Sequence, residues 1–226
     1  MKDIARFLSG FKEFQRTYFC GDDKVFSSLK EDQNPKVLVI ACSDSRVDPA
    51  ILTGCAPGDM FVVRNVANLV PPYEKFPGHH GVSAAVEYAI KVLQVEHVIV
   101  LGHSSCGGIR ALMAPDREAL GEFIAPWVKI AEPALREVSE KLPNKDDTLR
   151  QCACEQASVL VSLENLLTFP WIWERVMTGR LYLHGWYFDM NRGELLSYLP
   201  ETGSFEPLVA RCEAPGQAST GQSQTG

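Results

Sequence analysis

Two cysteines and one histidine in this chain have the residue types and spacing of metal ligands. Cys42 ends one apolar run, and His103 and Cys106 stand three residues apart at the end of another. Two thiolates and one imidazole suit Zn²⁺, and three protein ligands leave the fourth tetrahedral position open for catalysis. We therefore predict one catalytic Zn²⁺ per chain, with a Cys–His nucleophile pair as the competing interpretation.

An acidic and a basic residue follow the first cysteine. Asp44 and Arg46 lie two apart in CSDSR, so on an extended segment their side chains point the same way and can pair. A free carboxylate here could occupy the open metal position, and the planar guanidinium of Arg46 could hold it away. Asp44 would then orient metal-bound water. The alternative is a surface salt bridge, which contributes about 0–1 kcal/mol.

The elements that position these residues follow from hydrophobic patterns. Apolar runs without alternation at residues 36–42, 60–63 and 97–101 predict strands buried on both faces of a parallel sheet. Helical spacing at residues 81–93 predicts a strand–helix–strand unit. Ligands bind beyond the carboxyl ends of strands in such sheets, which is where Cys42 and His103 stand.

The later part of the chain completes an α/β fold. Helices are expected at residues 108–113, within 115–150 between prolines, and at 154–167. Late strands at 180–189 and 195–198 flank a turn and predict a hairpin with an antiparallel last strand. The predicted fold class is therefore α/β, with a central, mainly parallel sheet flanked by helices.

The two ends of the chain differ from its centre. Apolar residues share one face of an amphipathic helix within residues 1–20, and this face must pack on the chain's own body or on a partner subunit. Residues after 213 are polar and predict disorder. We expect an N-terminal helical arm at 1–34, an α/β zinc catalytic domain at 35–212 and a disordered tail at 213–226.

Composition narrows the function classes. The 226 residues carry a net charge of −6 without a basic stripe, which argues against nucleic-acid binding. No apolar run approaches the roughly 18 residues of a membrane span, and no signal-peptide core is visible. A cytoplasmic protein is expected, or an organellar one if a targeting segment has been removed. The seven cysteines, Cys152 and Cys154 among them, favour metal ligands or buried thiols over disulfides.

Three motifs taken together resemble the β-carbonic anhydrases: C-S-D-S-R at 42–46, R-N-V-A-N at 64–68 and G-H-S-S-C-G-G at 102–108. L-V-P-P-Y at 69–73 and E-N-L-L-T-F-P at 164–170 are similar to the plant-type branch. The resemblance implies zinc at Cys42, His103 and Cys106, with Asp44 and Arg46 as the catalytic dyad. It also implies reversible hydration of CO₂ to bicarbonate and a proton, by attack of zinc-bound hydroxide.

The resemblance implies a substrate pocket and an assembly as well. Gln33 stands where the plant-type family has a glutamine that reaches across a dimer interface. The apolar lining matches Phe61, Val66 and Tyr88, and the backbone N–H of Gly107 is a second anchor. Without the resemblance, Phe61 and Val66 would be interpreted as core residues. The family forms homodimers with exchanged N-terminal helices, or larger homo-oligomers, so a monomer should be inactive.

Other functions fit parts of the same pattern. A hydrolase of COS or CS₂ would use the same zinc site on a similar linear molecule. A non-catalytic zinc protein would bind the metal without turnover, and a redox enzyme would use Cys42 and Cys106. The proton carrier is open: His79 and His80 have a suitable ordinary pKa, but they also fit a solvated loop.

Overall fold

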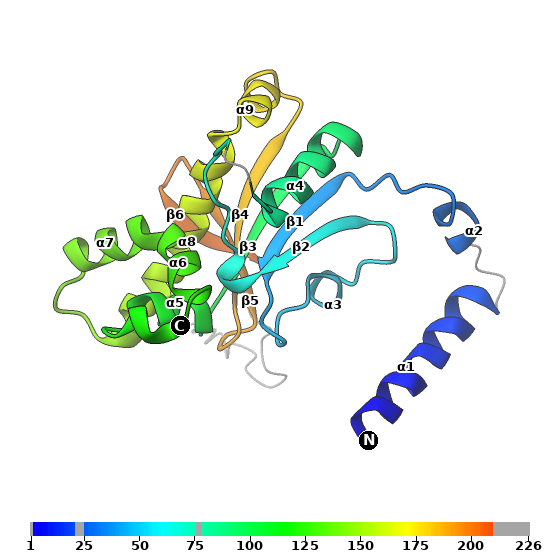
Figure 1. Ribbon diagram of the computed structural model, residues 1–226, viewed down its shortest axis with the longest axis horizontal. Helices are drawn as coiled ribbons and strands as arrows, with labels where there is room; N and C mark the ends of the chain where they lie inside the picture. Colours follow the sequence, from blue (N-terminus) through cyan, green and yellow to red (C-terminus); the bar gives the residue numbers. More distant parts are fainter. Residues whose placement is uncertain (1, 21–24, 76–77, 210–226) are drawn as a thin grey trace, which may run out of the picture.

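A computed structural model describes residues 2–20, 25–75 and 78–209. It confirms the predicted α/β class: one sheet has the order β2-β1-β3-β4-β5-β6 and helices pack against it (Figure 1). The first four strands in this order are parallel, β5 is antiparallel to β4, and β6 is antiparallel to β5. The strands are β1 (Val37–Cys42), β2 (Met60–Asn65), β3 (His97–His103), β4 (Tyr182–Asp189), β5 (Glu194–Leu199) and β6 (Ser204–Val209). The tail expected at 213–226 lies outside the described residues.

Helices are present where the sequence pattern predicts them and in other segments as well. They are α1 (Lys2–Phe19), α2 (Val25–Leu29), α3 (Pro49–Thr53), α4 (Gly81–Glu87), α5 (Gly107–Met113), α6 (Ile124–Val128), α7 (Glu132–Lys141), α8 (Asp147–Leu167) and α9 (Pro170–Met177). Helices α2, α3 and α9 are additional to those predicted. The helix expected over 81–93 continues after α4 as a π-helical turn, Tyr88–Val92. Helix α8 begins earlier than predicted because Asp146 caps it by accepting the N–H of Leu149.

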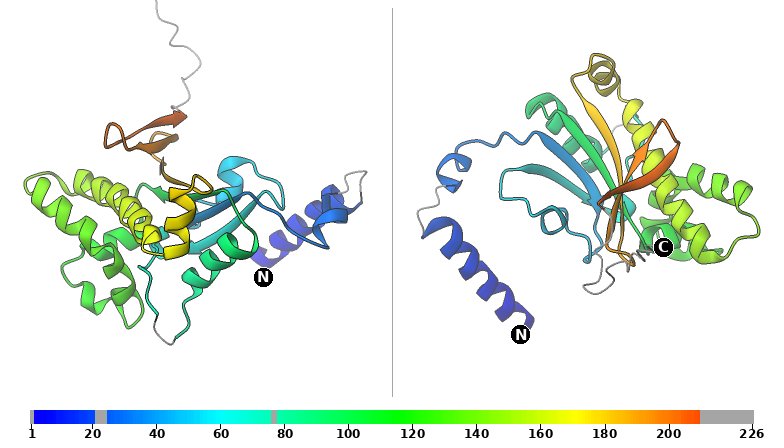
Figure 2. Two further views of the ribbon diagram at one scale, coloured as in Figure 1. Left: turned by 90° about the horizontal axis from the view of Figure 1, so that it is seen from above. Right: turned by 180° about the vertical axis from the view of Figure 1, so that it is seen from behind.

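The crossovers place the candidate ligands at a switch point of the sheet. The chain leaves β1 toward β2 on one side and returns to β3 on the other side of β1. Crossovers in opposite directions lie on opposite faces of a sheet. Helices α4, α8 and α9 accordingly lie on one face and α3 on the other (Figure 2). The carboxyl ends of β1 and β3 are therefore neighbours at the point where the crossovers diverge.

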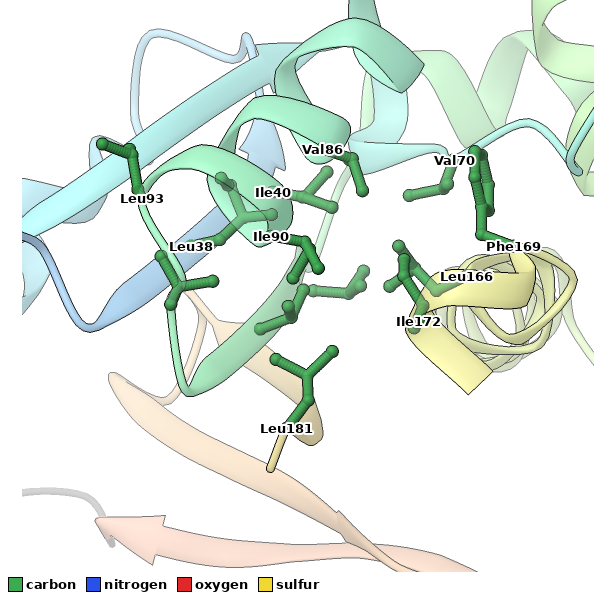
Figure 3. Close-up of a cluster of buried hydrophobic side chains, with 14 of the residues drawn as sticks. Leu38, Ile40, Val70, Val86, Ile90, Leu93, Leu166, Phe169, Ile172 and Leu181 are labelled. Atoms are coloured by element: carbon green, nitrogen blue, oxygen red, sulfur yellow. The ribbon is translucent and has the colours of Figure 1, made fainter. Parts of the chain in front are cut away.

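The main core lies between the sheet and the helices of the covered face. Figure 3 shows Leu38 and Ile40 of β1 meeting Ile90 beside α4 and Leu166 of α8. Helix α8 lies directly on β3, since a Cβ at Gly102 would come within 2.6 Å of Val159 Cγ2. This contact fixes α8 beside the end of β3, which carries His103.

Helix α1 has little cover within one chain. Figure 1 shows it clear of the sheet and its helices. Its contacts with α2 include the ring pair Phe14–Phe26, with centroids 5.7 Å apart. Apolar side chains on its remaining surface are about three-fifths exposed: Ile4, Phe7, Leu8 and Phe11. No helix in the described residues is both long and apolar enough to cross a membrane.

Candidate active site

The three predicted metal ligands converge in the folded chain. Cys42 ends β1, His103 ends β3, and Cys106 immediately precedes α5. All three are buried, and their donor atoms lie within 4.8 Å of one another. The two sulfur atoms are 4.0 Å apart. Tetrahedral zinc with Zn–S bonds of about 2.3 Å separates two sulfurs by about 3.8 Å, so the spacing suits this metal.

The histidine ring is oriented as a metal ligand would be. Its Nδ1–H donates to the carbonyl oxygen of Ser104 at 2.9 Å. A bond of this kind fixes the tautomer and leaves Nε2 with a free lone pair. The His103 Nε2 atom is buried and has no hydrogen-bond partner among the described residues. A metal ion would satisfy this atom, so the residues present fit Zn²⁺.

The sulfur pair favours an ionised thiol. The hydrogen bond from Cys106 lowers the pKa of Cys42 to about 4 against the opposing effect of burial, and the neighbouring His103 ring lowers it further. The backbone N–H groups of Asp44 and Ala67 near this sulfur also lower its pKa. The same sulfur contact raises the pKa of Cys106, because it keeps the shared proton. A thiolate is the form that binds metals, so the pair is prepared for one.

Asp44 and Arg46 form the expected pair. Arg46 Nε and Nη2 donate to the two carboxylate oxygens at 2.9 and 2.7 Å, and its backbone N–H donates at 3.0 Å. Arg46 Nη2 also donates to the carbonyl oxygen of Ser105 at 3.1 Å. Arg46 therefore joins the segment after Cys42 to the segment before Cys106. The guanidinium holds the pKa of Asp44 far below its usual range, which keeps the carboxylate ionised.

A second arginine, Arg64, forms hydrogen bonds with the segment that carries Cys42 and Asp44. Arg64 donates from Nε to the carbonyl oxygen of Cys42 at 2.9 Å and from Nη2 to that of Asp44 at 2.7 Å. Its Nη1 pairs with Asp48 at 2.9 Å, and Asp48 in turn caps α3. The loop that carries Cys42 and Asp44 is thus fixed from β2.

Glu155 is a residue of the site that sequence reasoning missed. This buried carboxylate on α8 accepts the backbone N–H of Cys106 at 2.8 Å. It also accepts Gln151 Nε2 at 2.8 Å and the hydroxyl of Tyr187 at 2.7 Å. Burial raises its pKa. The available signal was a single charged residue within a largely apolar stretch of a predicted helix, and that signal does not name its partner.

The structure divides the predicted substrate-binding residues into two groups. Val66 follows β2 beside the metal ligands, and a Cβ at Gly108 would lie 2.7 Å from Val66 Cγ1. Gly107 begins α5, where first-turn N–H groups lack partners within the helix. Gln33 and Tyr88 instead line a cavity of about 810 Å³ at the opposite, amino ends of the strands. The ring of Phe61 stacks on Tyr88 with centroids 5.8 Å apart.

Two pairs of residues singled out in the sequence, one of histidines and one of cysteines, lie away from the predicted metal ligands. His79 and His80 line a groove of about 510 Å³ beside α6. The sequence pattern places Cys152 and Cys154 before a helix, but both lie within α8. Cys154 is buried, while the sulfur of Cys152 lies 3.5 Å from the hydroxyl of Tyr187. Side chains two residues apart on a helix point in different directions, so the thiols of Cys152 and Cys154 do not converge.

Comparison with known proteins gives consistent matches. The family model for carbonic anhydrase matches residues 37–195. Beta carbonic anhydrase 3 of Arabidopsis thaliana is 42% identical over 195 residues, which cover 84% of this chain and 74% of that protein. Beta carbonic anhydrase 5, chloroplastic, of the same plant is 44% identical over 181 residues. That match covers 79% of this chain and 59% of the relative, so the chain spans less than two thirds of it.

Solved structures agree with the sequence matches. The β-carbonic anhydrase CcaA superposes with a TM-score of 0.85 at 34% identity, covering 93% of this chain and 94% of that one. A structure from a study of two tetrameric β-carbonic anhydrases of Sordaria macrospora gives a TM-score of 0.71 at 30% identity, covering 86% and 93%. By its family model, its relatives and its fold, this chain belongs to the plant-type branch of the β-carbonic anhydrases and is a carbonic anhydrase, a lyase.

Proposed function

We propose that this enzyme hydrates CO₂ reversibly to bicarbonate and a proton with one Zn²⁺ per chain, held by Cys42, His103 and Cys106. The observation that carries this proposal is the group of three buried donor atoms within 4.8 Å of one another. When bound, Zn²⁺ supplies a water of lowered pKa as the nucleophile for CO₂. A cytoplasmic location remains a prediction.

Asp44 and Arg46 have separate roles in this proposal. The ionised carboxylate of Asp44 accepts a hydrogen bond from the reacting water and so directs the water's lone pair toward the carbon of CO₂. Arg46 orients the carboxylate through both of its oxygens and prevents it from taking the metal's fourth position. The contact of Arg46 with Ser105 supports this orientation from the second ligand segment.

The substrate pocket is proposed to form between two copies of the chain. Val66 and the N–H of Gly107 come from the copy that holds the metal, and Gln33, Phe61 and Tyr88 come from the other. The position of Gln33 at the amino end of β1 supports this division, because Cys42 ends the same strand. A small apolar substrate suits apolar walls with one or two polar anchors.

The assembly proposed is a homodimer or a larger homo-oligomer. The exposed apolar face of α1 supports it, since such a face is stable only when covered. The similarity to β-carbonic anhydrases described as tetrameric supports it as well.

Metal analysis combined with a stopped-flow CO₂ hydration assay tests the proposal. We expect one zinc per chain and measurable hydration, and Cys106→Ser should lose both. Cys55→Ser is the matched control, because this partly exposed thiol lies outside the metal group. Stoichiometric zinc without hydration at about pH 8.5, where the water should be ionised, would instead identify a non-catalytic zinc protein.

A further inference from the structure

The turn that carries Val66 has a strained backbone. Ala67 and Asn68 both adopt left-handed φ angles, of 64° and 49°. A residue other than glycine in this conformation costs about 1–2 kcal/mol, and such strain persists only where surrounding contacts enforce it. Both residues are buried, so the turn is held by specific neighbours rather than by solvent.

This turn touches the metal site in two ways. The backbone N–H of Ala67 lies close enough to the sulfur of Cys42 to lower the pKa of that thiol. The turn also packs against the first residues of α5, since a Cβ at Gly108 would come within 2.9 Å of the Ala67 Cβ and closer still to Val66. The position of Val66 is therefore set by the conformation of the turn.

Three side chains hold the turn, and each holds a different part of it. Asn65 bonds both backbone groups of Leu69, at 2.8 and 2.9 Å, and closes the turn on its own segment. Ser162 of α8 donates to the carbonyl oxygen of Asn68 at 3.2 Å. Trp127 of α6 donates its indole N–H to the carbonyl oxygen of Val66 at 2.7 Å. Trp127 is thus the side chain that fixes the residue facing the substrate.

We propose that Trp127 is a positioning residue for the CO₂ pocket, acting through its N–H bond to Val66. This inference rests on the proposed pocket, in which Val66 is an apolar wall. Loss of the bond lets the turn relax and moves that wall relative to the metal. The three metal ligands come from the ends of β1 and β3 and the start of α5, so their convergence does not depend on Trp127.

The test compares steady-state CO₂ hydration by the zinc-loaded whole enzyme and its variants. Trp127→Phe keeps a ring and removes the N–H donor. We expect the KM for CO₂ to rise about fivefold, as for the loss of one hydrogen bond, with kcat within about twofold and zinc unchanged. Trp173→Phe on α9 is the matched control, because this tryptophan is 51% exposed, and it should leave all three quantities unchanged.

Two further measurements separate positioning from a general structural effect. Replacement of Trp127 by benzothienylalanine substitutes sulfur for the N–H without changing ring size. It should raise the KM for CO₂ about fivefold, and it keeps the test available if the phenylalanine variant does not fold. Val66→Ala should raise the KM for CO₂ by itself. In that background Trp127→Phe should raise KM by a further factor of less than about two, because Trp127 acts on the pocket only through Val66.

Each remaining outcome has a defined meaning. An unchanged KM in the benzothienylalanine enzyme, an undiminished fivefold effect in the Val66→Ala background, or a loss of kcat in proportion to lost zinc would overturn the role of Trp127. If Val66→Ala itself leaves KM unchanged, the proposed pocket fails, and the inference about Trp127 fails with it. If Val66→Ala raises KM and both Trp127 variants do not, only the inference about Trp127 fails.

Discussion

Two inactive variants of this enzyme should restore activity when mixed. Cys42→Ser removes a metal ligand, and Gln33→Ala removes the anchor that the second copy is proposed to supply. Strand β1 rises about 3.3 Å per residue, so its two ends are about 17 Å apart, and Gln33 precedes its first residue, Val37. One glutamine side chain cannot bridge that length. Gln33 must therefore act, if it acts at all, on the metal site of another copy.

The expected recovery follows from counting complete pockets. Random pairing of equal amounts of the two variants gives about half mixed dimers, and each has one complete pocket of two. About a quarter of wild-type activity should therefore return in the mixture and about half in isolated mixed dimers, while Gln33→Ala alone should retain about 1%, as for the loss of one catalytic anchor. The assay is stopped-flow CO₂ hydration on mixed dimers isolated through two different affinity tags.

A matched control uses two variants of the metal site. Cys42→Ser mixed with Cys106→Ser should restore nothing, because all three ligands of one site come from one chain. The reasoning is refuted if isolated mixed dimers of Cys42→Ser and Gln33→Ala are no more active than Gln33→Ala itself.

Three further perturbations test the surroundings of the site. Arg46→Ala should lower kcat/KM by at least about 100-fold with zinc retained, since Asp44 loses its orientation; full activity in the stopped-flow assay would contradict this role. Glu155→Ala strands the buried N–H of Cys106, the buried hydroxyl of Tyr187 and the partly buried amide of Gln151, so the free energy of unfolding should fall by about 3 kcal/mol or more in denaturant titrations; a fall below about 1 kcal/mol would show that water replaces the carboxylate. Burial, together with the charge of a neighbouring histidine, lowers the pKa of His184 from its ordinary value of 6.5. The unfolded chain then binds this proton more readily, so stability should fall as the pH drops below about 6.5, and His184→Gln should reduce that fall in thermal melts; an equal fall in the variant would assign it elsewhere.

The proposed metal ligands could be found in the sequence because Cys42 and His103 stand at the ends of strands and Cys106 follows His103 by three residues. A buried strand has a clear apolar pattern, and the carboxyl ends of neighbouring parallel strands share one edge of the sheet. Cys42 and His103 could therefore be placed near each other without coordinates. The pairing of Asp44 with Arg46 could be predicted from neighbouring residues in the same way, since side chains two residues apart on an extended segment point to the same side.

Contacts between distant elements could not be read in this way. Glu155 meets Cys106 only because α8 packs directly on β3, and no residue near Glu155 in the sequence indicates that contact. Strand β6 was missed because Ser204–Val209 is short, contains Pro207 and follows a hairpin that already looked complete. The separation of Gln33 from Val66 follows from the parallel pairing of β1 with β2, since Gln33 precedes β1 and Val66 follows β2, and it agrees with the implied glutamine that reaches across a dimer interface.

The exposed arm and the divided pocket point to one interface. Full burial of an apolar side chain contributes about 1.5–3 kcal/mol, so covering Ile4, Phe7, Leu8 and Phe11, each about three-fifths exposed, contributes roughly 4–7 kcal/mol per arm and roughly 7–14 kcal/mol for the two arms of a dimer. Association itself costs about 4–15 kcal/mol. The two arms therefore offset this cost with little margin, and a stable dimer needs further surface. If that surface includes the cavity lined by Gln33 and Tyr88, the contacts that stabilise the dimer also complete the pocket, and dissociation would abolish catalysis without any change at the metal.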